Sequence, residues 1–137
     1  MKEPRDNQRC YVCGKDNLVG LQAAFTVDKI GRTISGRFTP RTEHEGWEGI
    51  VHGGIVAAIL DEAMVKLAAH LGIPAVSAEL TVKFKAPAAA GDQLAITGKI
   101  VKESSRLVEA EAMVMRGPVL IGEAKGKLLK VRNADHE

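Results

Sequence analysis

Polar and apolar residues alternate with a period of two along most of the chain, which is the pattern of strands with one buried face. The pattern is clearest in residues 75–86, where Ser77 falls on the polar face and Leu80 on the apolar face. The segments that alternate in this way are predicted to be strands: residues 21–27, 32–39, 75–86, 93–102, 106–115 and 119–131.

One central segment breaks this alternation because it is apolar almost continuously. It opens at His52-Gly53-Gly54 and continues to about Leu71, where glycine and proline follow. Its length and these flanking residues predict an α-helix. Since the helix is apolar on nearly all sides, we expect a sheet to wrap around it rather than leave it on a surface.

The predicted elements follow the order β-β-α-β-β-β-β. Four consecutive strands with short links favour an antiparallel sheet. The predicted fold class is therefore α+β, an antiparallel sheet curled around one long helix. No linker or repeat divides the chain, so we expect an N-terminal arm over residues 1–20 and one domain over residues 21–137.

The composition excludes several classes of partner. The chain has 137 residues, a formal net charge of +2 and 4% aromatic residues, so it lacks the basic excess and the aromatic platforms of nucleic-acid-binding proteins. No segment has the roughly 20 apolar residues that span a membrane, and the start of the chain lacks the apolar core of a signal peptide. We expect no nucleic acid, no membrane and a cytoplasmic location.

Two neighbouring acids in the predicted helix differ in their surroundings. Glu62 shares a polar stripe with Lys66 and His70, spaced by four residues, which predicts a seam facing solvent or an interface. Asp61 has only apolar residues one turn away, so it needs a cavity or a partner to supply polar contacts. Glu62 is therefore set aside, and Asp61 is either a catalytic acid or an acid bonded to a loop or a partner subunit.

The start of the helix offers a second candidate feature. Gly53 and Gly54 leave backbone N–H groups uncovered at the positive end of the helix dipole, where an anion or a developing oxyanion binds. The alternative is that the two glycines only let the helix approach the sheet closely. His52 beside them is consistent with a cap or with a bond to a carbonyl.

Cys10 and Cys13 are the two cysteines of the chain. A Cys-x-x-Cys pair is half of a zinc site, but no second Cys or His pair follows at ligand spacing. His44 and His52 are poor candidates to complete such a site. We therefore expect no metal and an N-terminal strap with the thiols packed under it, and a metal site formed across subunits is the alternative.

These residues resemble the hotdog-fold acyl-CoA thioesterases, in the PaaI-like (phenylacetate-pathway) branch of the 4-hydroxybenzoyl-CoA thioesterase superfamily. The helix motif HGGIVAAILDEAM is the most specific part of the resemblance. The likeness covers most of the chain, at residues 10–21, 44–47, 52–64, 77–87 and 91–92.

The resemblance implies hydrolysis of an acyl-CoA thioester, with coenzyme A as part of the substrate and no further cofactor. Asp61 matches the family's catalytic carboxylate, a nucleophile or general base, and Gly53 and Gly54 match the oxyanion site. Ser77 matches a Ser/Thr that orients the water or the acid from the other subunit. His52 matches a residue that holds the thioester.

The resemblance also implies homodimers, or dimers of dimers, with sheets that join and active sites shared between subunits. The phosphates of coenzyme A need cations, and Lys83 and Lys85 are the candidates, although solvated strand-edge lysines are an equal alternative. Trp47 and His44 are candidates to line the acyl entrance, and Trp47 is also a candidate to plug the dimer core.

Two positions depart from the family's pattern. Gly46 stands where some PaaI-like enzymes carry Asn, which puts their active-site hydrogen bonding and aromatic acyl preference in doubt for this chain. Ser77 falls on the polar face of its strand and therefore points away from its own helix. That placement suits a residue that reaches a neighbouring subunit.

Two other functions fit the same fold. A hotdog enoyl-CoA hydratase or dehydratase uses a His and an acid at a different spacing and lacks the Gly-Gly-plus-Asp pattern. A non-catalytic acyl-CoA-binding protein would need a domain that transmits its signal, and the sequence offers none. Thioester hydrolysis is therefore the favoured prediction.

Overall fold

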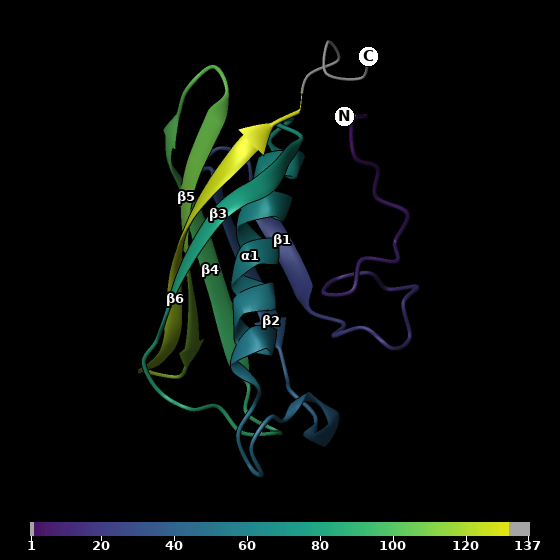
Figure 1. Ribbon diagram of the computed structural model, residues 1–137, viewed down its shortest axis with the longest axis vertical. Helices are drawn as coiled ribbons and strands as arrows, with labels where there is room; N and C mark the ends of the chain where they lie inside the picture. The colour runs from purple at the N-terminus through teal and green to yellow at the C-terminus, as the bar shows by residue number, and fades with distance from the viewer. Residues whose placement is uncertain (1, 132–137) are drawn as a thin grey trace.

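An antiparallel sheet of six strands covers one face of a single long helix, α1 (Gly53–His70), as Figure 1 shows. The computed structural model describes residues 2–131. A short 3-10 helix, η1 (Thr42–His44), lies in the loop before α1. The strands are β1 (Ala24–Asp28), β2 (Thr33–Phe38), β3 (Ala75–Phe84), β4 (Leu94–Glu103), β5 (Leu107–Arg116) and β6 (Val119–Lys130).

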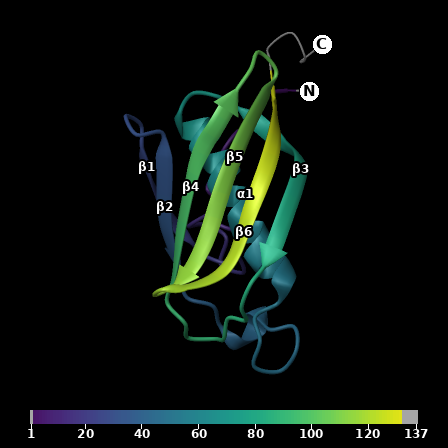
Figure 2. The same ribbon diagram turned by 90° about the vertical axis from the view of Figure 1, so that its left-hand side faces the viewer.

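The order of the strands in space is β1-β2-β4-β5-β6-β3, so β1 and β3 are the two edges of the sheet (Figure 2). This arrangement confirms the predicted α+β hotdog fold. Each predicted strand overlaps an observed one, and the predicted helix differs from α1 by one residue at each end. The end of the predicted domain, residues 132–137, lies outside the described residues.

The first strand begins later than predicted, at Ala24 instead of Leu21. Gln22 has a φ of 61°, which interrupts the extended backbone. The N–H groups of Leu21 and Ala23 donate instead to the carbonyls of Tyr11 and Val12. The segment before β1 is thereby tied to the N-terminal arm rather than to the sheet.

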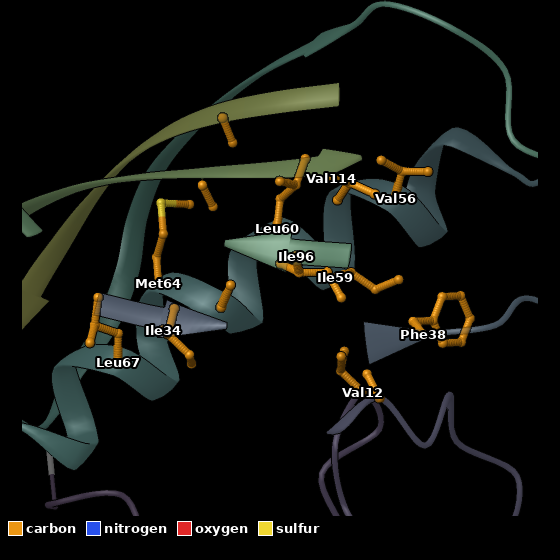
Figure 3. Packing of buried hydrophobic residues seen from close by; sticks show 14 of the residues in the cluster. Val12, Ile34, Phe38, Val56, Ile59, Leu60, Met64, Leu67, Ile96 and Val114 are labelled. Carbon is orange, nitrogen blue, oxygen red and sulfur yellow. The ribbon is translucent and has the colours of Figure 1, made fainter. Parts of the chain in front are cut away.

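The core lies between α1 and the inner face of the sheet. Figure 3 shows Leu60 and Met64 of α1 packed among side chains of β2, β4 and β5, and both are fully buried. Burying one such side chain stabilises the fold by roughly 1.5–3 kcal/mol. The buried residues of α1 are Val56, Ile59, Leu60, Ala63, Met64, Leu67 and Ala68.

The sheet alone does not wrap α1, contrary to the expectation from its apolar circumference. The N-terminal arm, purple in Figure 1, lies on a side of α1 that the sheet leaves open. Val12 of this arm is buried and joins the core. Within residues 2–131, the only helix long enough to consider for crossing a membrane is not apolar enough to do so.

β3 contains a one-residue bulge that changes the face of its first residues. Ser77 pairs with Leu128 and Glu79 pairs with Lys127, so Ala78 is the extra residue. Ser77 therefore shares the helix side of the sheet with the buried Leu128. The prediction that Ser77 points away from its own helix is wrong, because alternation counts every residue and the bulge adds one.

Candidate active site

Asp61 lies on α1 and accepts a hydrogen bond at Oδ1 from the Ser77 hydroxyl of the same chain. The bulge in β3 turns Ser77 toward the helix and makes this contact possible. Within residues 2–131, no side chain or backbone group bonds the second carboxylate oxygen. Asp61 is therefore held at one oxygen and free at the other, and its serine comes from its own chain rather than from across a subunit boundary.

His52 caps the start of α1. Its Nδ1 accepts a hydrogen bond of 2.8 Å from the Gly54 N–H. A ring that accepts at Nδ1 carries its proton at Nε2 when neutral. Since His52 is exposed, its Nε2–H is available to donate to a group bound from outside.

The two glycines of the predicted oxyanion site are not equivalent. The Gly54 N–H is already paired with His52, so the prediction that it is a free donor does not hold. The Gly53 N–H has no acceptor within residues 2–131 and lies at the positive end of an 18-residue helix. One free backbone donor, rather than two, is therefore ready for an oxyanion.

Gly46 packs directly against His52. A Cβ built on Gly46 would lie 3.0 Å from Cδ2 of the His52 ring, so an asparagine here would displace the ring. The loop and the capping histidine thus approach closely because this residue has no side chain. Gly46, which departs from the family's pattern, therefore contacts His52 of the candidate site.

A mostly apolar hollow of about 340 Å³ opens beside the first turn of α1. Phe84, at the end of β3, is 58% exposed and forms part of its wall. Lys85 is the charged residue of the lining. The other lining residues are Ile50, Val51, Gly53, Val56, Ala86, Pro87, Ala88 and Ile121.

Gly53 and Asp61 of one chain are too far apart to act on the same carbonyl group. They are eight residues apart on α1, which at about 1.5 Å per residue separates them by about 12 Å along the axis. A general base must lie within roughly 3 Å of the proton it removes. Asp61 therefore does not act on an electrophile bound at the amides of its own helix.

The predicted substrate-binding residues are dispersed. Trp47 is 83% exposed in the loop before α1. Lys85 lines the hollow beside Gly53. Lys83 lies among Glu111 and Glu123 in a separate depression, on strand positions that face away from the helix.

His44 does not line an entrance, because it is buried. Its Nδ1 accepts from the Arg41 N–H at 2.9 Å, and its ring packs against Phe38 with 5.4 Å between centroids. Burial lowers the pKa of His44 below its usual value. The residue shapes the loop as a neutral ring.

Glu62, set aside in the sequence, is the residue that sequence reasoning missed. Its Oε2 lies 2.9 Å from the sulfur of Cys10 and 2.6 Å from that of Cys13. Lys66 Nζ lies 3.3 Å from the Cys13 sulfur. The strap with packed thiols is thus present, and it covers the polar stripe that was predicted to face solvent or an interface.

This setting changes the acidity of the cluster. Burial, followed by the bond and the charge of Glu62, raises the pKa of Cys13 to about 12. Burial lowers the pKa of Lys66, but contacts with Cys13 and Glu62 outweigh it and the net shift is upward. The Cys-x-x-Cys spacing was the one sequence signal for this cluster, and nothing in the sequence assigned Glu62 to it.

Comparison with known proteins gives one family and one fold. The family model described as Thioesterase superfamily matches residues 48–122. The human protein acyl-coenzyme A thioesterase 13 is 29% identical over 89 residues, covering 64% of this chain and 59% of that protein. The chain therefore spans less than two thirds of the length of this curated relative.

Solved structures share most of the architecture at low identity. The Escherichia coli PaaI protein, from the phenylacetic acid degradation operon, superposes with a TM-score of 0.75 at 18% identity, covering 82% of this chain and 81% of that one. A hypothetical thioesterase from Streptococcus pneumoniae, solved with coenzyme A, gives 0.74 at 14% identity, covering 80% and 85%. These likenesses confirm the fold.

Proposed function

The chain belongs to the thioesterase superfamily, and we propose that it hydrolyses acyl-coenzyme A thioesters. The observation that carries the proposal is the Asp61 carboxylate, held at one oxygen by Ser77 and free at the other. The human relative is named as an acyl-coenzyme A thioesterase, and the free Gly53 N–H at a helix N-terminus provides an oxyanion donor.

We assign the two halves of each active site to two copies of the chain. Because Gly53 and Asp61 of one chain are about 12 Å apart along α1, the thioester carbonyl bound at Gly53 must meet the Asp61 of another chain. Each protomer then contributes an Asp61–Ser77 half to one site and a His52–Gly53 half to the other.

The exposed edge strand β3 supports a two-fold dimer. β3 is ten residues long and lies at one end of the sheet, where its unpaired backbone groups are open to a second strand. Antiparallel pairing of two copies of β3 brings the Phe84 end of one toward the Ser77 end of the other. This is the direction in which the two halves of the site approach one another.

The chemistry follows from these positions. Asp61 takes a proton from water, and the water oxygen attacks the thioester carbonyl carbon while the developing oxyanion accepts from the Gly53 N–H. The carbon–sulfur bond then breaks and the thiolate leaves with a proton, yielding the free acid and coenzyme A. In the alternative route, Asp61 attacks the carbonyl itself and water hydrolyses the resulting anhydride.

A thiol-release assay over short, long-chain and aryl acyl-CoA substrates tests the proposal. The wild-type protein should release coenzyme A, and Asp61→Asn should lower kcat by roughly 10²- to 10⁴-fold. Glu109→Gln is the control, since it removes another partly buried carboxylate from β5, on the sheet face away from α1. Full activity in a folded Asp61→Asn variant would overturn the proposed role.

Other outcomes identify the competing functions. A hydratase would consume the enoyl absorbance of crotonyl-CoA without releasing thiol, and a binding protein would bind without turnover on any substrate. Native mass spectrometry tests whether the protein forms the proposed dimer. A monomer that hydrolyses the substrate would contradict the shared site. Single-turnover hydrolysis in heavy-oxygen water identifies a nucleophilic Asp61 whose anhydride is opened by water at the Asp61 carboxyl carbon, because the first acid product then carries an Asp61 oxygen and Asp61 gains the heavy one.

A further inference from the structure

The N-terminal arm and α1 bring together three side chains that commonly bind metals. The sulfurs of Cys10 and Cys13 and a carboxylate oxygen of Glu62 all lie within 4.8 Å of one another, and all three residues are half-buried. We propose that these three residues, the Cys-Glu cluster, bind one Zn²⁺ ion that fastens the arm to the helix. The completing ligand comes from α1 rather than from a histidine, which is why the sequence showed only half a site.

The distances in the cluster suit a tetrahedral zinc site after a small adjustment. Zinc bonds of about 2.3 Å to sulfur and about 2.1 Å to oxygen place tetrahedral sulfur and oxygen ligands about 3.6 Å apart. The observed separations from Glu62 Oε2 are 2.9 Å for Cys10 and 2.6 Å for Cys13. The ligands therefore need to open by about 1 Å or less to admit the ion.

The pattern of contacts also points to an ion. One carboxylate oxygen faces both sulfurs, so three atoms converge on a single point from two segments that are 49 or more residues apart in the sequence. In the metal-free state the two thiols donate to this one oxygen, which has lone pairs for both. Once the thiols lose their protons, the two sulfurs and the oxygen supply three of the four ligands of a tetrahedral zinc ion.

Lys66 balances the charge of the proposed complex. Two thiolates and a carboxylate contribute three negative charges, which leave one negative charge after Zn²⁺ binds. The ammonium group of Lys66 lies 3.3 Å from the Cys13 sulfur, where it donates a hydrogen bond to the ligand and neutralises this excess. Such second-layer hydrogen bonds orient and stabilise metal ligands.

The bound ion would serve structure rather than hydrolysis. The cluster faces the arm, whereas the neighbouring Asp61 faces Ser77 of β3. Zinc binding displaces the two thiol protons and links residues 10–13 to α1, so its free energy adds to the stability of the arm. The fourth position of the tetrahedron is left for water.

Metal analysis of the full-length protein, purified under reducing conditions, tests this inference directly. Mass spectrometry of the metals should find about one zinc per chain, and a chromophoric chelator should measure its affinity. Glu62→Gln and Cys13→Ser should each weaken zinc binding by more than about 100-fold, and Lys66→Met by about 10- to 100-fold. Glu62→His should retain zinc because it supplies another ligand.

His70→Asn is the matched control. His70 is exposed, lies in the last turn of the same helix four residues after Lys66, and is of a residue type that can bind metals but is not part of the cluster. Its replacement should therefore leave the zinc content unchanged. Protein that holds no zinc, and takes up none when Zn²⁺ is added to its reduced thiols, would overturn the inference. So would a Cys10–Cys13 disulfide in the native protein that excludes the metal. Because metal content is read without substrate, neither result depends on the proposed hydrolysis.

Discussion

Asp61 and Glu62 are adjacent in sequence, yet the structure surrounds them differently. One carboxylate oxygen of Asp61 accepts a hydrogen bond from the Ser77 hydroxyl of the edge strand β3, and the other oxygen is free. Glu62 accepts hydrogen bonds from the thiols of Cys10 and Cys13 in the N-terminal arm, and Lys66 lies one helical turn away. Neighbours on a helix point about 100° apart, so consecutive acids face different elements. The environment of a helical acid is therefore set by the element that covers it, more than by its neighbours in sequence.

The largest effect on stability is expected in the core beneath α1, because this core holds in place the helix that carries both acids. Met64→Ala removes a fully buried side chain and should lower the free energy of unfolding by about 2–5 kcal/mol. Urea denaturation at fixed protein concentration measures it. Met113→Ala is the control, because Met113 is 41% exposed, and it should change stability by about 0.5 kcal/mol or less. Equal losses in the two variants would contradict the observed core.

The alkylation rate of Cys13 should report on the environment that surrounds Glu62. Because the pKa of Cys13 is raised from 9.0 to about 12, less thiolate is present at pH 8, and alkylation should be roughly 100- to 1000-fold slower than for an unfolded thiol. The rate should rise as the pH approaches 12. The measurement uses Cys10→Ser protein treated with a chelator, with the same protein in urea as the reference. Equal folded and unfolded rates would contradict the burial of Cys13.

Ser77→Ala should weaken the Asp61 side alone. A hydrogen bond to a charged group contributes about 1.5–3 kcal/mol, so kcat should fall roughly 10- to 100-fold with KM little changed. Ser77→Thr keeps the hydroxyl and should restore most of the rate. Ser35→Ala, an exposed serine of β2, is the control. An unchanged kcat in Ser77→Ala would show that Ser77 does not position Asp61.

The smallest effect is expected for a third carboxylate, that of Glu103, and it concerns the free energy of unfolding. Lys130 and Arg32 bond Glu103 at 2.7 and 2.8 Å and lower its pKa below 4.5. Because the folded pKa is lowered, the stabilisation is present above pH 4.5 and is lost as the pH falls below that value. Glu103→Gln should lower the free energy of unfolding by less than about 1 kcal/mol at pH 7. Urea titrations at pH 7 and pH 3 should show this difference shrinking in acid.

The fold was largely predictable because its signals are local. Alternation located all six strands, and Gly72 and Pro74 marked where the helix would end. Gln22 limited the first strand, because a residue with a φ of 61° interrupts an extended pattern without leaving a sequence signal of its own. The incomplete wrapping of α1 was also missed, since apolar composition shows that a helix is covered but not by which element.

The site was less predictable because its contacts join distant segments. Asp61 and the helix start were identified from one stretch of sequence, but the pairing of the Gly54 N–H with His52 depends on a side-chain rotamer. The burial of His44 depends on Phe38 and the loop after it. The contact between Glu62 and the thiols depends on where the arm crosses α1, which no periodicity records.

The extra residue in β3 has a consequence for how such a chain can change by mutation. Deleting Ala78 would remove the bulge and join Ser77 directly to Glu79, with Ser77 still opposite Leu128 and Glu79 still opposite Lys127, so the Ser77 hydroxyl would stay on the helix side. Most substitutions at Ala78 would leave the hydroxyl where it is. Residue 78 can therefore be lost or altered without turning the serine away from the acid, and an ungapped alignment through this strand would place the serine of a chain that lacks this residue one position off.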